Sequence, residues 1–135
     1  MKKSILFLFL ATGFFFTSCD KDDSTSNDND PDKSSLLDKW WFDSNNGTAD
    51  IYFHSDGKYE QKMILLENKF VGSGDWAWED ENSGIMKIEN LEGRGQIASS
   101  VWLKISNIQS NTFTLQLSID GTDYSKEVFY QDTEE

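Results

Sequence analysis

The chain has 135 residues, of which 37% are apolar, so it can form one domain with a small core and is too short for two. Acidic residues outnumber basic residues by 24 to 12, which gives a formal net charge of -12. This charge excludes nucleic acid as a partner and argues against adhesion to anionic lipid head groups, because both need clustered Lys and Arg, and Arg94 is the only arginine.

Residues 1–18 have the pattern of a signal peptide. Lys2 and Lys3 precede an apolar stretch over residues 5–16, and two small residues follow it. This stretch is shorter than the roughly 20 residues of a membrane-spanning helix, which disfavours the alternative of an uncleaved anchor helix. We therefore expect cleavage before Cys19, the only cysteine in the chain.

Residues 16–19, Phe-Thr-Ser-Cys, resemble the cleavage site of bacterial lipoproteins, in the looser form found among the Bacteroidota. The resemblance implies that Cys19 becomes the first residue and is lipidated, with acyl chains such as palmitate. Each buried methylene contributes about 0.8 kcal/mol, so several chains hold a domain to a membrane. The resemblance thus implies an outer-membrane lipoprotein on the periplasmic or cell-surface face. Residues 21–23, Lys-Asp-Asp, are similar to a signal that exports such lipoproteins to the surface.

Residues 19–35 predict the acylated cysteine followed by a disordered acidic tether. From residue 20 onward this segment holds six Asp, two Lys and no aliphatic or aromatic residue, so it cannot form a core. Its expected reach is on the order of 20 Å. Asp28, Asp30 and Asp32 have the spacing that opens a calcium loop, but Lys stands where that loop requires Gly and Glu, so we expect no metal site.

From residue 36 onward, apolar and polar residues alternate, and all five tryptophans and four tyrosines lie in this part of the chain. Alternation predicts strands with one buried face and one solvated face. The expected strands, in chain order, cover residues 39–43, 49–54, 58–66, 74–79, 85–91, 98–108, 112–119 and 122–130. Asp56-Gly57 and Asp120-Gly121 indicate tight turns between them.

Regular strands joined by short turns predict an all-β domain over residues 36–135. The strands would form an eight-stranded antiparallel meander that closes as a barrel. A β-sandwich is the alternative, because strand spacing alone does not distinguish a closed sheet from two packed sheets.

The segment Leu37-Asp38-Lys39-Trp40, with Asp56-Gly57 in an early turn, resembles the lipocalin-like domains of Bacteroidota lipoproteins. Lipocalins carry Gly-x-Trp at the start of the first strand, and here Asp38 stands at the glycine position. The resemblance implies a lipocalin-like barrel that binds a small apolar or amphipathic ligand in its mouth. It also implies that Trp40 points inward and closes the other end, so that Trp41 points outward.

The candidate ligand-binding residues are Trp40, Trp76 and Trp78. Trp76 and Trp78 share one strand face, and large inward aromatics either pack a small core or line a pocket. We expect neither catalytic residues nor a cofactor: His54 is the only histidine, and alternation places it on the exposed face. A zinc site would require three or four converging ligands, which one histidine and a lipidated cysteine do not supply.

These observations favour a non-enzymatic binding domain whose only contact with a membrane is its lipid anchor. The alternative is a protein-interaction module, such as an inhibitor, adhesin or complex subunit, whose partner the sequence does not identify. It would use outward aromatics such as Tyr52, Trp102, Tyr124 and Phe129. A third hypothesis, a hydrolase, would need two carboxylates that converge in a cleft.

Overall fold

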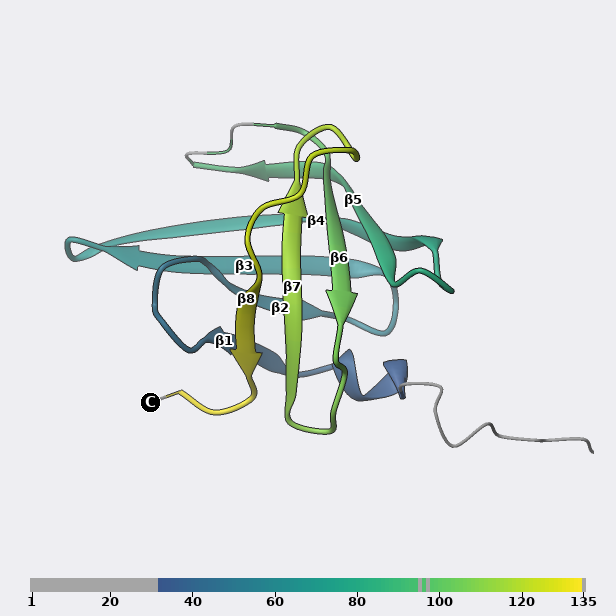
Figure 1. The fold of residues 1–135 in the computed structure, drawn as a ribbon. Coiled ribbons are helices and arrows are strands. Elements are labelled where there is room, and N and C mark those ends of the chain that lie inside the picture. The colour runs from purple at the N-terminus through teal and green to yellow at the C-terminus, as the bar shows by residue number, and fades with distance from the viewer. Residues whose placement is uncertain (1–31, 95, 97, 135) are drawn as a thin grey trace, which may run out of the picture.

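The chain folds as a closed barrel of antiparallel strands. A computed structural model describes residues 32–94, 96 and 98–134 (Figure 1). A short 3-10 helix, η1 (Lys33–Leu36), precedes eight strands that follow the order of the chain. The strands are β1 (Trp40–Asp43), β2 (Asp50–Phe53), β3 (Lys58–Leu65), β4 (Asn68–Asp80), β5 (Ile85–Gly93), β6 (Val101–Ser106), β7 (Thr112–Ser118) and β8 (Val128–Gln131). The predicted all-β meander is confirmed.

Closure of the sheet decides between the barrel and the sandwich. Each strand pairs with the next, and β8 returns to β1 through the pairs Phe42↔Gln131 and Asp43↔Tyr130. A sandwich would hold two separate sheets packed face to face, so that alternative is wrong. Because the sheet closes on itself, each of the eight described strands has a neighbour on both sides.

β4 begins at Asn68 and not at residue 74, so its first part departs from the prediction. Leu66 and Glu67, with φ of 49° and 66°, form the tight turn of a β3–β4 hairpin. Such turns usually carry Asn-Gly or Asp-Gly, so Leu-Glu gives no turn signal. The segment 72–74, Gly-Ser-Gly, lies within β4 at an irregularity of the β4–β5 register.

The connection between β7 and β8 is longer than the sequence predicts. Asp120-Gly121 indicates a tight hairpin with a strand from residue 122, yet β8 begins at Val128. The Asp120 carboxylate accepts hydrogen bonds from the N–H groups of Thr122 (2.8 Å) and Asp123 (2.9 Å). These backbone hydrogen bonds hold the pKa of Asp120 well below its usual range, so the carboxylate stays ionised and organises a loop.

The facing of β1 is opposite to the prediction. Trp41 is fully buried in the barrel, whereas Trp40 is half-buried on the outer face. The register explains this result, because Trp41 lies directly opposite Ile51, which shares the inward face of β2 with Phe53. The buried tryptophan of this barrel is therefore one residue later than the resemblance to lipocalins implies.

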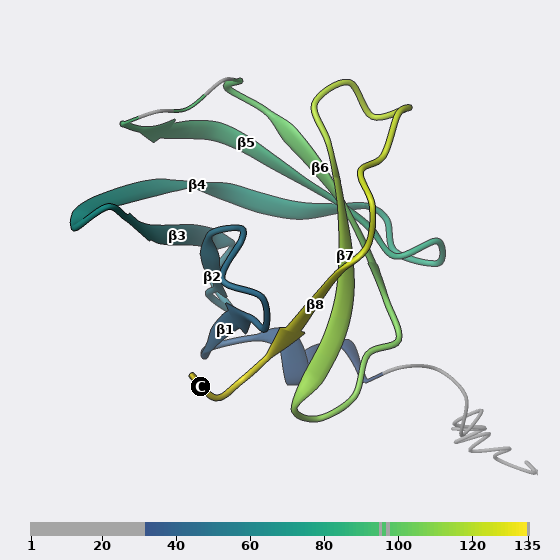
Figure 2. The same ribbon diagram turned by 60° about the vertical axis from the view of Figure 1, so that its left-hand side comes forward.

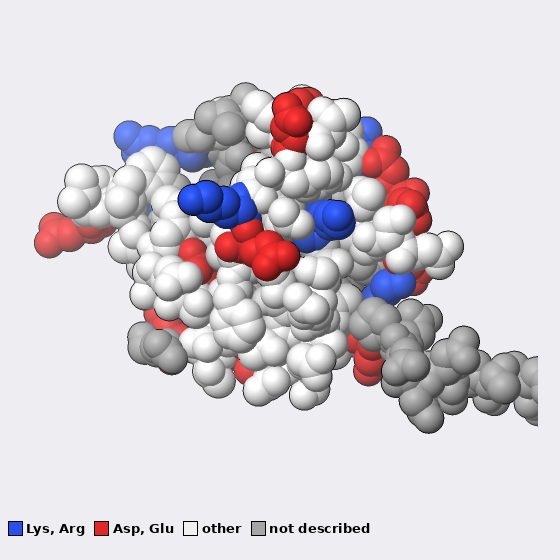
Figure 3. Space-filling model, in the orientation of Figure 1, with Lys and Arg blue, Asp and Glu red and all other residues white. Residues whose placement is uncertain are grey.

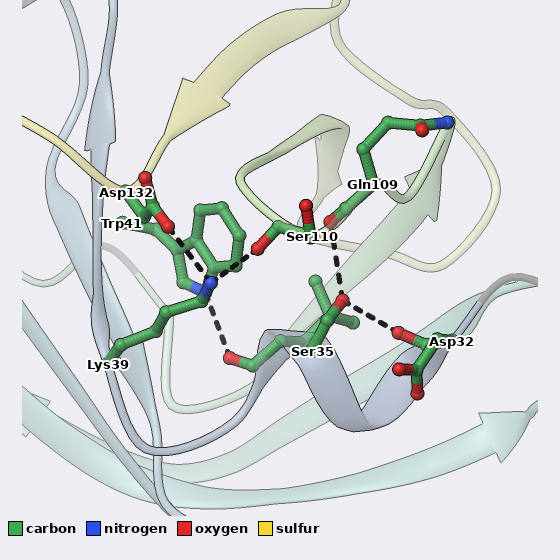
Figure 4. Close-up of polar contacts among 8 residues, drawn as sticks. Asp32, Ser35, Lys39, Trp41, Gln109, Ser110 and Asp132 are labelled. Carbon is green, nitrogen blue, oxygen red and sulfur yellow. Dashed lines mark hydrogen bonds and ion pairs between the residues drawn. The ribbon is translucent and has the colours of Figure 1, made fainter.

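Trp41 forms the centre of the closed end of the barrel. Its indole N–H donates to the Leu36 carbonyl at 2.9 Å. The Lys39 ammonium lies 4.4 Å from the centre of the Trp41 ring, donates to the Ser110 carbonyl at 2.6 Å and pairs with Asp132 at 3.1 Å (Figure 4). The cation over the buried Trp41 ring is therefore Lys39, which directly precedes β1 in the chain.

Helix η1 packs under Trp41 as a plug. Leu36 is completely buried, and the Ser35 hydroxyl donates to the Asp32 carbonyl at 2.7 Å and contacts the Gln109 carbonyl at 3.3 Å (Figure 4). Residues 33–35, which the sequence assigns to the tether, thus belong to the folded domain. No helix among the described residues is long and apolar enough to cross a membrane.

Candidate functional site

A cavity of about 290 Å³ lies at the end of the barrel opposite η1. The connections that follow β1 and β7 border it, through Ala49 and Ile119 among others. Its apolar wall is formed by Ile51, Leu91, Val101, Leu103, Leu115 and Val128. Leu117 and Ile119 stand at its rim and are exposed. Strand alternation predicted most of these inward positions, but it does not indicate how much space they enclose.

Two polar side chains of β3 contribute to the cavity lining. Tyr59 is buried, and its hydroxyl donates to the Gln61 amide oxygen at 3.0 Å. Burial raises the pKa of the Tyr59 phenol far above its usual value, so this group is a neutral hydrogen-bonding partner and not an anion. The cavity therefore offers a neutral polar pair on β3, and Gln96 and Ser125 add further neutral polar side chains to its lining.

A second polar network holds the loop that borders the cavity. The Tyr130 hydroxyl donates to the Ala49 carbonyl at 2.8 Å and lies 2.9 Å from the Thr48 hydroxyl. Burial raises the pKa of Tyr130 as well, so its phenol also stays neutral. Because these bonds engage the polar atoms of Tyr130 and Thr48, this side of the cavity presents mainly carbon to a ligand.

Asp43 anchors this loop from inside the barrel. Its side chain is 3% exposed, and its carboxylate accepts N–H bonds from Asn45 (2.9 Å), Gly47 (2.9 Å) and Thr48 (2.8 Å) as well as the Thr48 hydroxyl (2.9 Å). Burial opposes ionisation, but the hydrogen bonds outweigh it and hold the pKa of Asp43 below its ordinary value. Sequence reasoning missed this residue, because an Asp beside a polar turn is usually solvated.

The three tryptophans proposed from the sequence lie outside this cavity. Trp76 and Trp78 stand 6.3 Å apart, ring centre to ring centre, and pack against the core. The indole N–H of Trp76 donates to the His54 carbonyl at 2.8 Å. Trp40 lies on the outer face, 5.4 Å from the ring of Tyr52. The structure therefore does not bring Trp40 together with the other two.

A larger depression of about 530 Å³ lies on the outer face, where Trp40 forms one wall. Charged side chains, among them Glu60, Lys62, Lys69 and Glu92, form much of the remaining wall. This depression is shallower and more polar than the cavity in the barrel mouth. Since small-molecule sites are usually enclosed and mostly apolar, the smaller mouth cavity is the better candidate.

Asp75 and Glu89, two of the carboxylates that a hydrolase could use, are held by neighbours on the outer face. Asp75 pairs with Lys58 at 2.5 Å and accepts from the Asn90 amide at 2.8 Å, while Glu89 pairs with Lys87 at 2.7 Å. The described lining of the mouth cavity contains no acidic side chain. In the part of the chain that the structure describes, no three His, Cys, Asp or Glu side chains gather as a metal site.

The outward aromatics do not form the broad exposed patch that the protein-interaction alternative needs. Tyr52, Trp102 and Tyr124 are half-buried, and only Phe129 is exposed. The Trp102 indole donates to the Glu79 carboxylate and its ring lies beneath the Lys87 ammonium at 5.2 Å. This face therefore gives that alternative little support.

Comparison with protein-family models, curated proteins and solved structures finds no match for this chain. Its candidate site consequently rests on the geometry of the barrel mouth alone.

Proposed function

We propose that this protein is a lipid-anchored, non-enzymatic envelope protein whose lipocalin-like barrel binds a small apolar or amphipathic molecule in its mouth. The observation that carries the proposal is the apolar cavity of about 290 Å³ between β2, β3 and β5–β8. A packed barrel core would leave few voids larger than a water molecule. A cavity of this size at the open end therefore supports the binding of a ligand.

The lining limits the chemistry of the ligand. The cavity volume of about 290 Å³ lies near the lower end of the range for ligand pockets, which is about 300–1,000 Å³. The ligand is therefore small, or only part of it enters the cavity. The described wall offers no charged side chain to pair with an ionic group. Tyr59 and Gln61 supply hydrogen bonds for one neutral polar group. An uncharged, mainly hydrocarbon molecule fits these conditions best.

Binding can be tested with 1-aminoanthracene, an uncharged fluorescent probe whose emission rises when it leaves water. We expect saturable binding to the wild-type chain. Leu117→Trp should abolish it, because Leu117 lines the cavity at its rim. Lys104→Trp is the matched control, since this residue is exposed on the neighbouring strand and does not line the cavity. Equal binding by both variants, or none by the wild type, would contradict the proposal.

The anchor has a separate test, because Cys19 lies outside the described residues. Cys19→Ser removes the only thiol that can be acylated. We expect the variant to lose metabolic labelling with palmitate and to appear either as a soluble protein or as an uncleaved precursor. If it retains the label, or stays with membranes after cleavage and a high-salt wash, the lipoprotein assignment is wrong.

A further inference from the structure

The β3–β4 hairpin extends past the rest of the barrel and ends in exposed aliphatic side chains. β5 ends at Gly93, opposite Gly72, and among the described residues the segment 63–70 pairs only with itself. The hairpin projects from the barrel in both ribbon views (Figures 1 and 2). At its tip Ile64 is 73% exposed and Leu66 86% exposed, with Leu65 between them at 55%.

The turn of this hairpin is unfavourable for the residues that occupy it. Leu66 has a φ of 49°, a left-handed conformation that costs about 1–2 kcal/mol for residues with a Cβ. Asn-Gly would relieve this strain and remove an apolar side chain from water. The chain instead combines backbone strain with exposure of leucine, and a strained residue at an exposed tip points to a function.

Two basic side chains, Lys69 and Arg94, lie near the aliphatic tip, although the chain as a whole is strongly acidic. Lys69 lies directly opposite Ile64, and the guanidinium of Arg94 lies 5.9 Å from the ring of Phe70. Figure 3 shows a mainly uncharged projection with acidic atoms at its end and basic atoms nearby. Glu67, beside Leu66, is the acidic residue of the turn.

We propose that this tip, consisting of Ile64, Leu65 and Leu66, contacts the surface of a lipid bilayer. The aliphatic side chains enter the interface, and Lys69 and Arg94 face the lipid phosphates. The Glu67 carboxylate must stay hydrated, so it limits the contact to the level of the head groups. This contact is additional to the lipid anchor, which the sequence predicts to be the only membrane contact, and it does not depend on a ligand in the barrel.

The composition of the tip favours lipid over a protein partner. Protein interfaces depend mainly on Trp, Tyr and Arg anchors, and leucine is under-represented among them. A second copy fits less well, because a stable interface buries about 800 Å² on each partner, whereas this tip is narrow and convex. Two chains that each carry a net charge of -12 would also repel each other.

The test uses the full chain with Cys19→Ser, so that an added cysteine is its only thiol. Asn68→Cys places an environment-sensitive fluorophore at the tip, and Asn82→Cys places it in the β4–β5 turn as a control; both positions are exposed. Vesicles of phosphatidylcholine carry nitroxide quenchers at the head group or deep in the acyl chain. We expect a blue shift and strong head-group quenching at position 68, with little change at position 82.

Two variants separate tip contact from general adsorption through the N-terminal residues. Leu66→Asp should remove most of the quenching at position 68. Leu66→Asn combined with Glu67→Gly should also remove it, while raising the urea midpoint because this pair suits the turn. The second variant keeps the hairpin folded, so loss of quenching there cannot result from unfolding.

Three results would overturn the proposal: no quenching at position 68, equal quenching at positions 68 and 82, or quenching that both variants retain. A blue shift at position 68 that grows with protein concentration without vesicles would show that a second copy covers the tip. Binding of 1-aminoanthracene is measured without vesicles, so failure of the lipid contact and failure of the cavity proposal are distinguishable.

Discussion

Trp41→Ala is expected to lower the free energy of unfolding by about 3–5 kcal/mol, because truncating a buried tryptophan loses transfer energy and leaves a cavity. Trp41 is fully buried, and its ring meets Phe113 edge-on with centres 4.8 Å apart. The variant also leaves the buried Leu36 carbonyl without its indole donor. A small domain has only about 5–15 kcal/mol of stability, so this loss should lower the urea midpoint severely.

Trp40→Ala is the matched control for this experiment. Trp40 is half-buried on the outer face, where it contacts Tyr52 and lies 4.3 Å from the Lys62 ammonium. Such contacts are worth about 1 kcal/mol, so the urea midpoint should fall only slightly. Urea denaturation followed by circular dichroism measures both variants. Equal losses, or a larger loss for Trp40→Ala, would mean that β1 faces the other way.

Asp43→Ala is expected to cost about 3 kcal/mol, because it removes the shared acceptor of three loop N–H groups and of the Thr48 hydroxyl. The N–H groups of Asn45, Gly47 and Thr48 all donate to this buried carboxylate. Its loss should also loosen the loop that carries Ala49 to the rim of the cavity. We therefore expect weaker binding of 1-aminoanthracene together with the lower urea midpoint.

The contribution of Asp43 should depend on pH in a defined direction. Its pKa is lowered in the folded state, against about 3.9 in the unfolded chain. The stabilisation is thus present above the unfolded value and is lost as pH falls through the folded-state value. Asp43→Asn cannot ionise, so the stability gap between wild type and Asp43→Asn should narrow in acid. A gap that stays constant into strong acid would show that the Asp43 carboxylate is not ionised in the fold.

Strand alternation was sufficient to predict the wall of the cavity. Leu115 on β7 lies between Thr114 and Gln116, and it faces the barrel interior as expected, as does Leu103 on β6. Alternation did not decide the facing of Trp40 and Trp41, because two adjacent tryptophans leave no polar residue to assign to the solvent, and the facing implied by the resemblance to lipocalins is wrong. Only the pairing of Trp41 with Ile51, which is a tertiary contact, decides the facing.

Other features could not be predicted because they depend on the folded environment of single residues. Leu66-Glu67 forms a tight turn without the residues that usually mark one, so the first part of β4 was missed. Aspartate is usually exposed, so the sequence does not indicate that Asp43 is buried. Its burial depends on β8, which places Tyr130 beside the β1–β2 loop. The volume of the mouth cavity likewise depends on how far the loops stand apart, which alternation does not encode.

The seam between β1 and β8 has a consequence for how the chain reaches its fold. It joins residues near the two ends of the domain, Phe42 and Gln131, through a contact of high sequence separation. Such contacts form slowly, because the chain loses the conformational entropy of a long loop before strand pairing stabilises the closed form. Until β8 is added, β1 and β7 are edge strands of an open sheet, and their unpaired backbone groups can pair with strands of other chains. A nascent or truncated chain that ends before Val128 is therefore prone to aggregation, and its last four-residue strand is what makes the barrel self-contained.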